Sequence, residues 1–263
     1  MSDLVLVQQR DAVVEIVLNR ADKRNAMNWA MMQDLDAAIN KASVMSGVRA
    51  VLLRAEGRGF SAGIDLTSFQ ETPDTFGENW RQNMFPITAA YQAIVNKFER
   101  CPFPVIALLH GYVLGLGLEL ALACDMRIVT EGTLLGLPET MLGIVPDVGG
   151  TTRLTRLIGP ARAKEYVMTG KNIPVEAAER WGLVNYIVPK NGLMEKANQL
   201  VNELMVAAPL AVSYAKQVIN NIEDVDRGLQ LEAYAQARLM ATEDFEQGAM
   251  AMITKQRPTW KGK

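Results

Sequence analysis

The spacing of hydrophobic residues predicts alternating strands and helices through the first half of the chain. Short runs rich in valine, isoleucine and leucine predict strands at 12–18, 50–54, 105–110 and 126–130. Apolar residues at three- and four-residue intervals predict helices at 29–44 and 80–99, and a further helix opens near Leu116. Asn28 is expected to cap the first of these helices. Because strands alternate with helices, the pattern favours an α/β fold with buried parallel strands.

The second half of the chain is almost entirely helical. Helices are predicted at 160–170 and 175–181, and one last strand, VNYIVP, begins at Val184. The remaining patterns are all helical, at 193–206, 210–221, 226–240 and 243–254. We therefore expect an α/β core over residues 1–197 and a helical C-terminal region over residues 198–263. The polar segment 67–79, which contains a proline and a glycine, is expected to be a mobile loop.

The most apolar stretch of the chain, GYVLGLGLELALACD at 111–125, contains a single carboxylate before its last residue. This carboxylate, Glu119, lies between two leucines, and an ionised carboxylate is costly to bury unless it has a partner or a shifted pKa. Residues 103–124 are long enough for a membrane span. A proline, three glycines and the carboxylate argue against one, so we expect a buried strand followed by a buried helix.

The composition argues against several classes of protein. A formal net charge of −2 gives no support to a nucleic-acid or membrane-surface footprint. Two cysteines, Cys101 and Cys124, and one histidine, His110, exclude a disulfide scaffold and a Cys/His zinc site. The lone thiols and an N-terminus without a signal-peptide pattern favour a cytoplasmic location. Cys124 and His110 are both interpreted as core residues, the histidine with a hydrogen bond.

Two glycine-rich turns, SAGID at 61–65 and GLGLE at 115–119, each follow a strand and precede a helix. If they lie side by side, two backbone N–H groups can point at one oxygen atom and form an oxyanion hole. Turn glycines without a ligand explain the same pattern equally well. A dinucleotide site is disfavoured, because the motif G-x-G-x-x-G is broken by Leu120.

Three acidic residues are candidates for chemistry: Glu119 in the second turn, Glu139 in the loop LPETM and Asp147 in VPDVGG. Each has a structural interpretation, and Asp147 before a helix is a natural cap. The apolar neighbours of Glu119 favour a buried site instead. Two carboxylates that face each other in a low-dielectric pocket have their pKa values pushed apart, as acid–base catalysis requires.

These motifs together resemble the crotonase superfamily, the enoyl-CoA hydratases and isomerases, over nearly the whole chain. LNRADKRNAMN at 18–28 resembles the N-terminal coenzyme A segment, with Ala21 where proline is usual. GRGFSAGIDL and GYVLGLGLELALACD resemble the two oxyanion turns. GLPETMLGIVPDVGGTTRLTRLIG resembles the catalytic loop, and DFEQGAMAMITKQRPTW at 244–260 resembles the C-terminal helix.

The resemblance implies a crotonase-like spiral of ββα repeats whose helical C-terminal region builds homotrimers, often paired into hexamers. It implies an acyl-CoA thioester as the substrate, no separate cofactor and no metal, with coenzyme A as part of the substrate. The N–H groups of Ala62 and Leu116 would form the oxyanion hole, and Glu119 and Glu139 would be the catalytic pair. The coenzyme A and substrate site would include Arg24, Ala26, Ala62, Gly63, Ile64, Asp65 and, from a neighbouring subunit, Lys255.

Two departures from the family pattern leave alternatives open. Leu116 replaces the middle one of three usual glycines. FSAGIDL, FERCPFPVIALLHG and PDVGG resemble the dienoyl-CoA isomerase branch, which uses acids at the positions of Glu139 and Asp147. The leading hypothesis is syn-hydration of a 2-enoyl-CoA by two glutamates. The alternative is double-bond isomerisation, and a more remote one is a non-catalytic or RNA-binding homologue.

Overall fold

The structure, a computed structural model, describes residues 3–70, 72–207, 209–220, 236–237 and 240–256. A six-stranded sheet lies at its centre, with strand order β1-β2-β3-β4-β6-β8. The first pair is antiparallel and the other pairs are parallel, which confirms the predicted parallel core. The strands are β1 Val5–Arg10, β2 Val13–Leu18, β3 Ala50–Ala55, β4 Val105–Leu109, β6 Met126–Thr130 and β8 Tyr186–Val188.

Three strands were not predicted from the sequence patterns. The edge strand β1 has only one buried residue, Val5, and its last three residues are exposed. Strands β5 (Tyr112–Leu114) and β7 (Leu134–Gly136) form a separate two-stranded parallel sheet. A three-residue strand is too short for any periodicity to be visible. This small sheet matters for the site, because β5 leads directly into the second glycine turn at Gly115.

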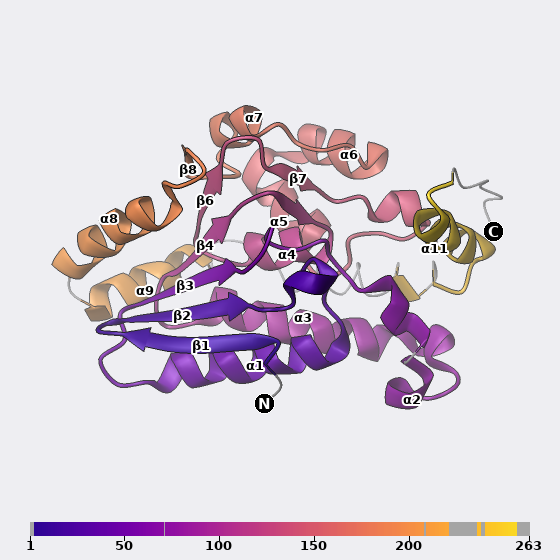
Figure 1. Cartoon of the computed structure of the whole chain (residues 1–263), viewed down its shortest axis with the longest axis horizontal. Helices are drawn as coiled ribbons and strands as arrows, with labels where there is room; N and C mark the ends of the chain where they lie inside the picture. Colours follow the sequence, from indigo (N-terminus) through magenta and orange to yellow (C-terminus); the bar gives the residue numbers. More distant parts are fainter. Residues whose placement is uncertain (1–2, 71, 208, 221–235, 238–239, 257–263) are drawn as a thin grey trace.

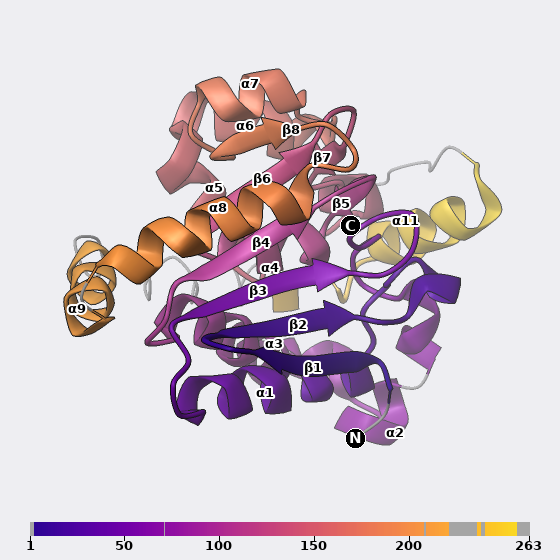
Figure 2. The ribbon, with the colours of Figure 1, turned by 60° about the vertical axis from the view of Figure 1, so that its left-hand side comes forward.

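Helices cover both faces of the main sheet (Figure 1). The larger core lies between one face and the helices α1 Trp29–Val44, α3 Met84–Arg100, α4 Leu116–Leu122, α5 Gly150–Ile158, α6 Pro160–Thr169 and α7 Val175–Arg180. Helix α1 has the predicted bounds and cap: the Asn28 side chain accepts a hydrogen bond from the Met31 N–H at 3.1 Å. On the other face α8 (Leu193–Val206) crosses the strands (Figure 2). Its residues Ala197, Leu200 and Val201 pack there.

The segment expected to be a loop at 67–79 contains short helices instead. These are the 3₁₀ helix η2 (Leu66–Gln70) and α2 (Thr72–Phe76), followed by η3 (Trp80–Asn83). Aromatic side chains hold them in place: the rings of Phe69 and Trp80 stack with centroids 5.8 Å apart, and Phe76 contacts Trp29 at 5.0 Å. The polar sequence hid these contacts because the aromatic residues follow no regular spacing.

The C-terminal helices agree with the sequence prediction where the structure describes them. They are α9 (Pro209–Asn220) and α11 (Glu243–Thr254); most of the helix expected at 226–240 lies outside the described residues. Helix α11 packs on η4 (Glu139–Leu142), which carries one of the predicted acids. The predicted boundary at residue 197 falls inside α8, and the two-part division stays a prediction. Within the described ranges, no helix is long and apolar enough to cross a membrane.

Candidate active site

The two glycine turns lie against each other, as the sequence suggests. The Leu114 N–H donates to the carbonyl oxygen of Ser61 at 3.0 Å. A Cβ atom placed on Gly63 would lie 2.9 Å from the Leu114 carbonyl oxygen, so only glycine permits this approach. The turn after Ser61 and the turn at Gly115 therefore form one continuous surface.

The N–H group predicted for the first turn is the wrong one. Ala62 donates its N–H to the carbonyl oxygen of Arg24 at 3.0 Å, so it is not available to a ligand. Ile64 pairs with Met27 in an isolated parallel bridge. The bridge is made by the residues on either side of Ile64: the Gly63 carbonyl accepts from the Met27 N–H, and the Asp65 N–H donates to the Met27 carbonyl. The Ile64 N–H is therefore directed away from Met27, and Ile64 lines a cavity. The geometry moves the first donor from Ala62 to Ile64.

The second donor is where the sequence places it. Leu116 is the first residue of α4, where a helix makes no internal bond to the N–H. Leu116 lines the same cavity as Ile64. Within the part of the chain that the structure describes, neither of these two N–H groups has a hydrogen-bond partner. Two free donors at one cavity are the arrangement that an oxyanion hole requires.

The cavity beside these donors has a volume of about 660 Å³, counting the space at its mouth. All three predicted acids line it, with an apolar wall from Phe69, Phe76, Trp80, Met84, Ile87 and Ile144. The structure thus gathers residues that are widely separated in the sequence around one apolar chamber.

Glu119 is held in a fixed orientation at this cavity. It is 2% exposed, and its Oε1 accepts hydrogen bonds from the N–H groups of Val148 and Gly150, both at 2.8 Å. These donors lie at the start of α5, where backbone N–H groups favour negative charge. Bonds from two N–H groups stabilise the carboxylate form of the glutamate.

Glu139 has the opposite surroundings. It is 8% exposed, and its Oε2 is buried without a hydrogen-bond partner among the described residues. It lies over the second turn, since a Cβ on Gly115 would be 2.7 Å from its Oε1. Burial, with a further contribution from the charge of Asp147, raises the pKa of Glu139 to about 8. Glu139 therefore keeps its proton at neutral pH, whereas the Oε1 of Glu119 accepts two backbone hydrogen bonds.

This raised pKa predicts a change in stability with pH. The pKa of Glu139 is 4.5 in its ordinary state and about 8 in the folded chain, so folding holds the proton more tightly. The resulting stabilisation is complete below pH 4.5 and is lost as the pH rises to about 8. We expect Glu139→Gln to raise Tm relative to the wild type at pH 9 by ~2 °C or more, and by less at pH 5.

Thermal unfolding followed by circular dichroism at both values of pH measures this difference. Glu131→Gln, at an exposed position, is the matched control and should show the same difference from wild type at both. A Glu139→Gln variant whose Tm advantage does not grow with pH would contradict the assignment of a neutral Glu139.

Asp147 is the third acid at the cavity and is tied to α3. Its Oδ2 accepts a hydrogen bond from the Thr88 hydroxyl at 2.7 Å, and its carbonyl oxygen accepts one from the Gln92 amide at 2.6 Å. Burial and the charge of Asp147 raise the pKa of the neighbouring Tyr91. Asp147 is not the N-cap of α5, which is Gly149; it lines the cavity and contributes charge there.

The segments expected to bind coenzyme A also come together. Residues 24–27 run beside residues 62–65 through the bond from Ala62 to Arg24 and the bridge from Met27 to Ile64. Asp65 is buried, and despite the opposing effect of burial its pKa is lowered by Thr67 and Arg20.

Two residues that no sequence pattern singled out, Arg20 and Asn25, hold the segments 24–27 and 62–65 in place by hydrogen bonds. The Arg20 guanidinium donates to Asp65 at 2.6 Å and to the Ala26 carbonyl at 2.8 Å. Asn25, 1% exposed, donates to the carbonyls of Glu56 and Gly59. The only sequence signal was the polar run that contains them. Binding of coenzyme A by these segments stays a prediction.

Three further residues can now be placed. Lys255 is exposed at the end of α11. Cys124 packs in the core as predicted, where burial raises the pKa of its thiol to about 12. His110 differs from the prediction: it is half-buried rather than in the core, although its ring does bond to the Gly57 carbonyl at 3.1 Å. It lies at the end of β4, where the sheet surface opens to solvent.

Comparison with known proteins shows the family to which the chain belongs. The model of the family described as enoyl-CoA hydratase/isomerase matches residues 8–263. The chain belongs to the enoyl-CoA hydratase/isomerase family. It is 35% identical to the 2,3-dehydroadipyl-CoA hydratase of Escherichia coli over all of both chains. It is 30% identical to the mitochondrial Delta(3,5)-Delta(2,4)-dienoyl-CoA isomerase of Dictyostelium discoideum, over 95% of this chain and 87% of that one.

The solved structures of the family share the fold. The enoyl-CoA hydratase of Bacillus anthracis superposes with a TM-score of 0.76 and is 35% identical, over 99% of this chain and all of that one. The predicted crotonase fold and family are therefore confirmed, and the chain is an enzyme of the enoyl-CoA hydratase/isomerase type. Relatives include both hydratases and an isomerase, so family membership alone does not assign the reaction.

Proposed function

We propose that this enoyl-CoA hydratase/isomerase family enzyme catalyses the syn-hydration of 2-enoyl-CoA thioesters. The observation that carries the proposal is the contrast between its two glutamates. Glu119 is fixed as a carboxylate by two N–H groups, whereas Glu139 is buried, lacks a hydrogen-bond partner in the described structure at Oε2 and has a pKa of about 8. One base and one acid at a single apolar cavity are what addition of water requires.

The proposed steps use only these groups. The thioester oxygen accepts hydrogen bonds from the N–H groups of Ile64 and Leu116, which stabilise the enolate that forms. Glu119 takes a proton from water, and the resulting hydroxyl bonds to the β-carbon. Glu139 donates its proton to the α-carbon, so both ends of the double bond are filled from one water molecule and one carboxylic acid. Proton exchange between the glutamates and solvent restores the starting state.

Double-bond isomerisation is the second candidate, and Asp147 supports it. This acid lines the cavity, and its charge contributes to the raised pKa of Glu139. A pair formed by Asp147 and Glu139 would move a proton along a conjugated chain without adding water. The similarity to a dienoyl-CoA isomerase agrees with this second reading.

Isotope labelling separates the two reactions. We expect the wild-type enzyme to convert a 2-enoyl-CoA in H₂¹⁸O into a product with one ¹⁸O on the β-carbon, detected by mass spectrometry. The panel should contain uncharged acyl groups, because the cavity wall is apolar, and a 3,5-dienoyl-CoA as the isomerase substrate. In D₂¹⁸O, no turnover of the 2-enoyl-CoA, together with a product from the dienoyl-CoA that carries deuterium on carbon but no ¹⁸O, would overturn hydration in favour of isomerisation.

The remaining properties belong to this proposal. A homotrimer or hexamer, a cytoplasmic location and contact between Lys255 of a neighbouring subunit and a coenzyme A phosphate follow from the resemblance to the family. The proposed chemistry needs no metal and no redox cofactor. The net charge of −2 gives no support to an RNA-binding role.

A further inference from the structure

Four polar residues form a row along the buried side of α3. Thr88, Gln92, Asn96 and Glu99 are separated by four, four and three positions, which places them on one side of a helix. The first three are 1%, 7% and 9% exposed, and the Glu99 side chain is 19% exposed. Buried polar groups are costly unless they are hydrogen-bonded, so the row should have defined partners.

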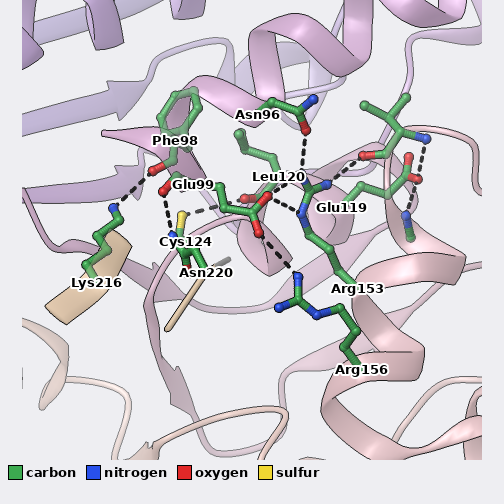
Figure 3. Close-up of polar contacts among 12 residues, drawn as sticks. Asn96, Phe98, Glu99, Glu119, Leu120, Cys124, Arg153, Arg156, Lys216 and Asn220 are labelled. Carbon is green, nitrogen blue, oxygen red and sulfur yellow. Dashed lines mark hydrogen bonds and ion pairs between the residues drawn. The ribbon is translucent and has the colours of Figure 1, made fainter. Parts of the chain in front are cut away.

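One half of the row binds the loop between η4 and α5, and the other half binds α5 itself. Thr88 and Gln92 bind Asp147, as described above. Asn96 and Glu99 bind the guanidinium of Arg153, at 2.6 Å and 2.7 Å (Figure 3). Arg153 itself is only 3% exposed, so its ion pair with Glu99 is largely shielded from water.

Arg153 in turn fixes the peptide groups that face Glu119. Its Nη1 donates to the Val148 carbonyl at 3.2 Å, and its backbone N–H donates to the Gly149 carbonyl at 2.8 Å. A Cβ on Gly149 would lie 1.8 Å from Nη1, so the guanidinium packs directly on this turn. The carbonyls of the turn thus bind Arg153, while the N–H groups of Val148 and Gly150 bind Glu119.

We propose that Arg153, anchored by Asn96 and Glu99, is a positioning residue that fixes the 148–150 turn and so orients the Glu119 carboxylate. The proposal rests on the proposed function, in which Glu119 is the base. The buried row of α3 then has two roles: Asn96 and Glu99 anchor Arg153, and the other two residues of the row restrain Asp147. Catalysis is sensitive to such restraints, since a displacement of 1 Å can cost ~100-fold in rate.

Two variants weaken the anchor to different degrees. Arg153→Lys removes the planar fork that spans Asn96, Glu99 and Val148, and Glu99→Gln removes the charge while keeping an oxygen acceptor. We expect kcat to fall ~10-fold or more for Arg153→Lys and by less for Glu99→Gln, with KM changed less than ~3-fold in both. The assay is steady-state hydration of a 2-enoyl-CoA.

Arg127→Lys is the matched control. Arg127 is also a buried arginine, 4% exposed, that binds backbone carbonyls, those of Ala121, Cys124 and Leu183. Arg127→Lys should lower the free energy of unfolding with little effect on kcat per folded molecule, because none of the carbonyls that Arg127 binds belongs to the 148–150 turn. Equal losses of kcat in Arg127→Lys and Arg153→Lys, at equal folded fractions, would overturn the positioning role.

Amide hydrogen exchange measured by NMR gives a readout that does not depend on the reaction. We expect exchange at Val148 and Gly150 to be slow in the wild type and in Arg127→Lys, and faster in Arg153→Lys and Glu99→Gln. Unchanged exchange in the last two variants would overturn the proposal. If the wild type turns over no thioester, the proposed function fails, and the exchange rates alone decide whether Arg153 fixes the turn.

Discussion

Replacing Glu139 with glutamine is expected to lower kcat for hydration by about 10²–10⁴-fold, with a much smaller change in KM. Glutamine keeps the shape of the side chain but has no proton to give to the α-carbon. The raised pKa of Glu139 is what suits the residue to donate a proton at neutral pH, so its loss acts on the chemical step. Steady-state hydration of a 2-enoyl-CoA by purified protein measures the effect.

The pH dependence of the wild type provides an internal check on this result. Because Glu139 must be protonated to act as the acid, kcat/KM should fall as the pH rises through about 8, the pKa of Glu139 in the enzyme without substrate. Glu131→Gln is the control and should retain wild-type kcat, since Glu131 is exposed and lies outside the cavity. A Glu139→Gln enzyme with more than ~10% of the wild-type kcat would show that another group supplies the proton.

The sequence predicted the large elements of the fold because their patterns are strong. All five predicted strands lie within one or two residues of the observed bounds, and α1 has the predicted limits. The misses have physical causes: β5 and β7 have three residues each, and the helices η2 and α2 depend on contacts such as that between Phe69 and Trp80. Contacts between distant residues leave no local pattern.

The candidate site was predictable in its acids but not in its backbone donors. Glu119 was visible as a carboxylate in an apolar run, and it lies at the cavity with Glu139 and Asp147. The choice between Ala62 and Ile64 depends on which way successive N–H groups point in the bridge to Met27, and side-chain identity does not encode that direction. The polar row on α3 was missed because Gln92 or Asn96 in a helix usually indicates a solvent-facing side.

A second large effect is expected at the oxyanion hole, where Leu116→Pro removes one N–H donor without breaking the helix. Leu116 is the first residue of α4, a position that tolerates proline because its N–H is not used inside the helix. Gly115 before it has φ 50° and ψ −127°, outside the right-handed helical region that proline disfavours in the preceding residue. We expect kcat to fall about 10²–10³-fold relative to Leu116→Ala.

Leu116→Ala is the reference for this comparison rather than the wild type. The Leu116 side chain is 3% exposed and packs in the core, so both variants lose its contacts, but only the proline loses the N–H. The two variants should therefore have similar melting temperatures and very different values of kcat, measured with the same 2-enoyl-CoA. Similar kcat values in the two variants would remove Leu116 from the oxyanion hole.

The structure also explains why a leucine can stand in a turn where the family usually has three glycines. Gly115 adopts the positive φ of 50° that the turn requires. Gly117 allows the first turn to pack closely against the helix, since a Cβ on Gly117 would lie 2.7 Å from the Ser61 Cβ. Leu116 needs neither, because its own φ is not positive. The leucine side chain lines the cavity while its N–H stays free in the described structure, so the leucine narrows the cavity and leaves the N–H donor in place. The comparison of proline with alanine at this position tests that separation directly.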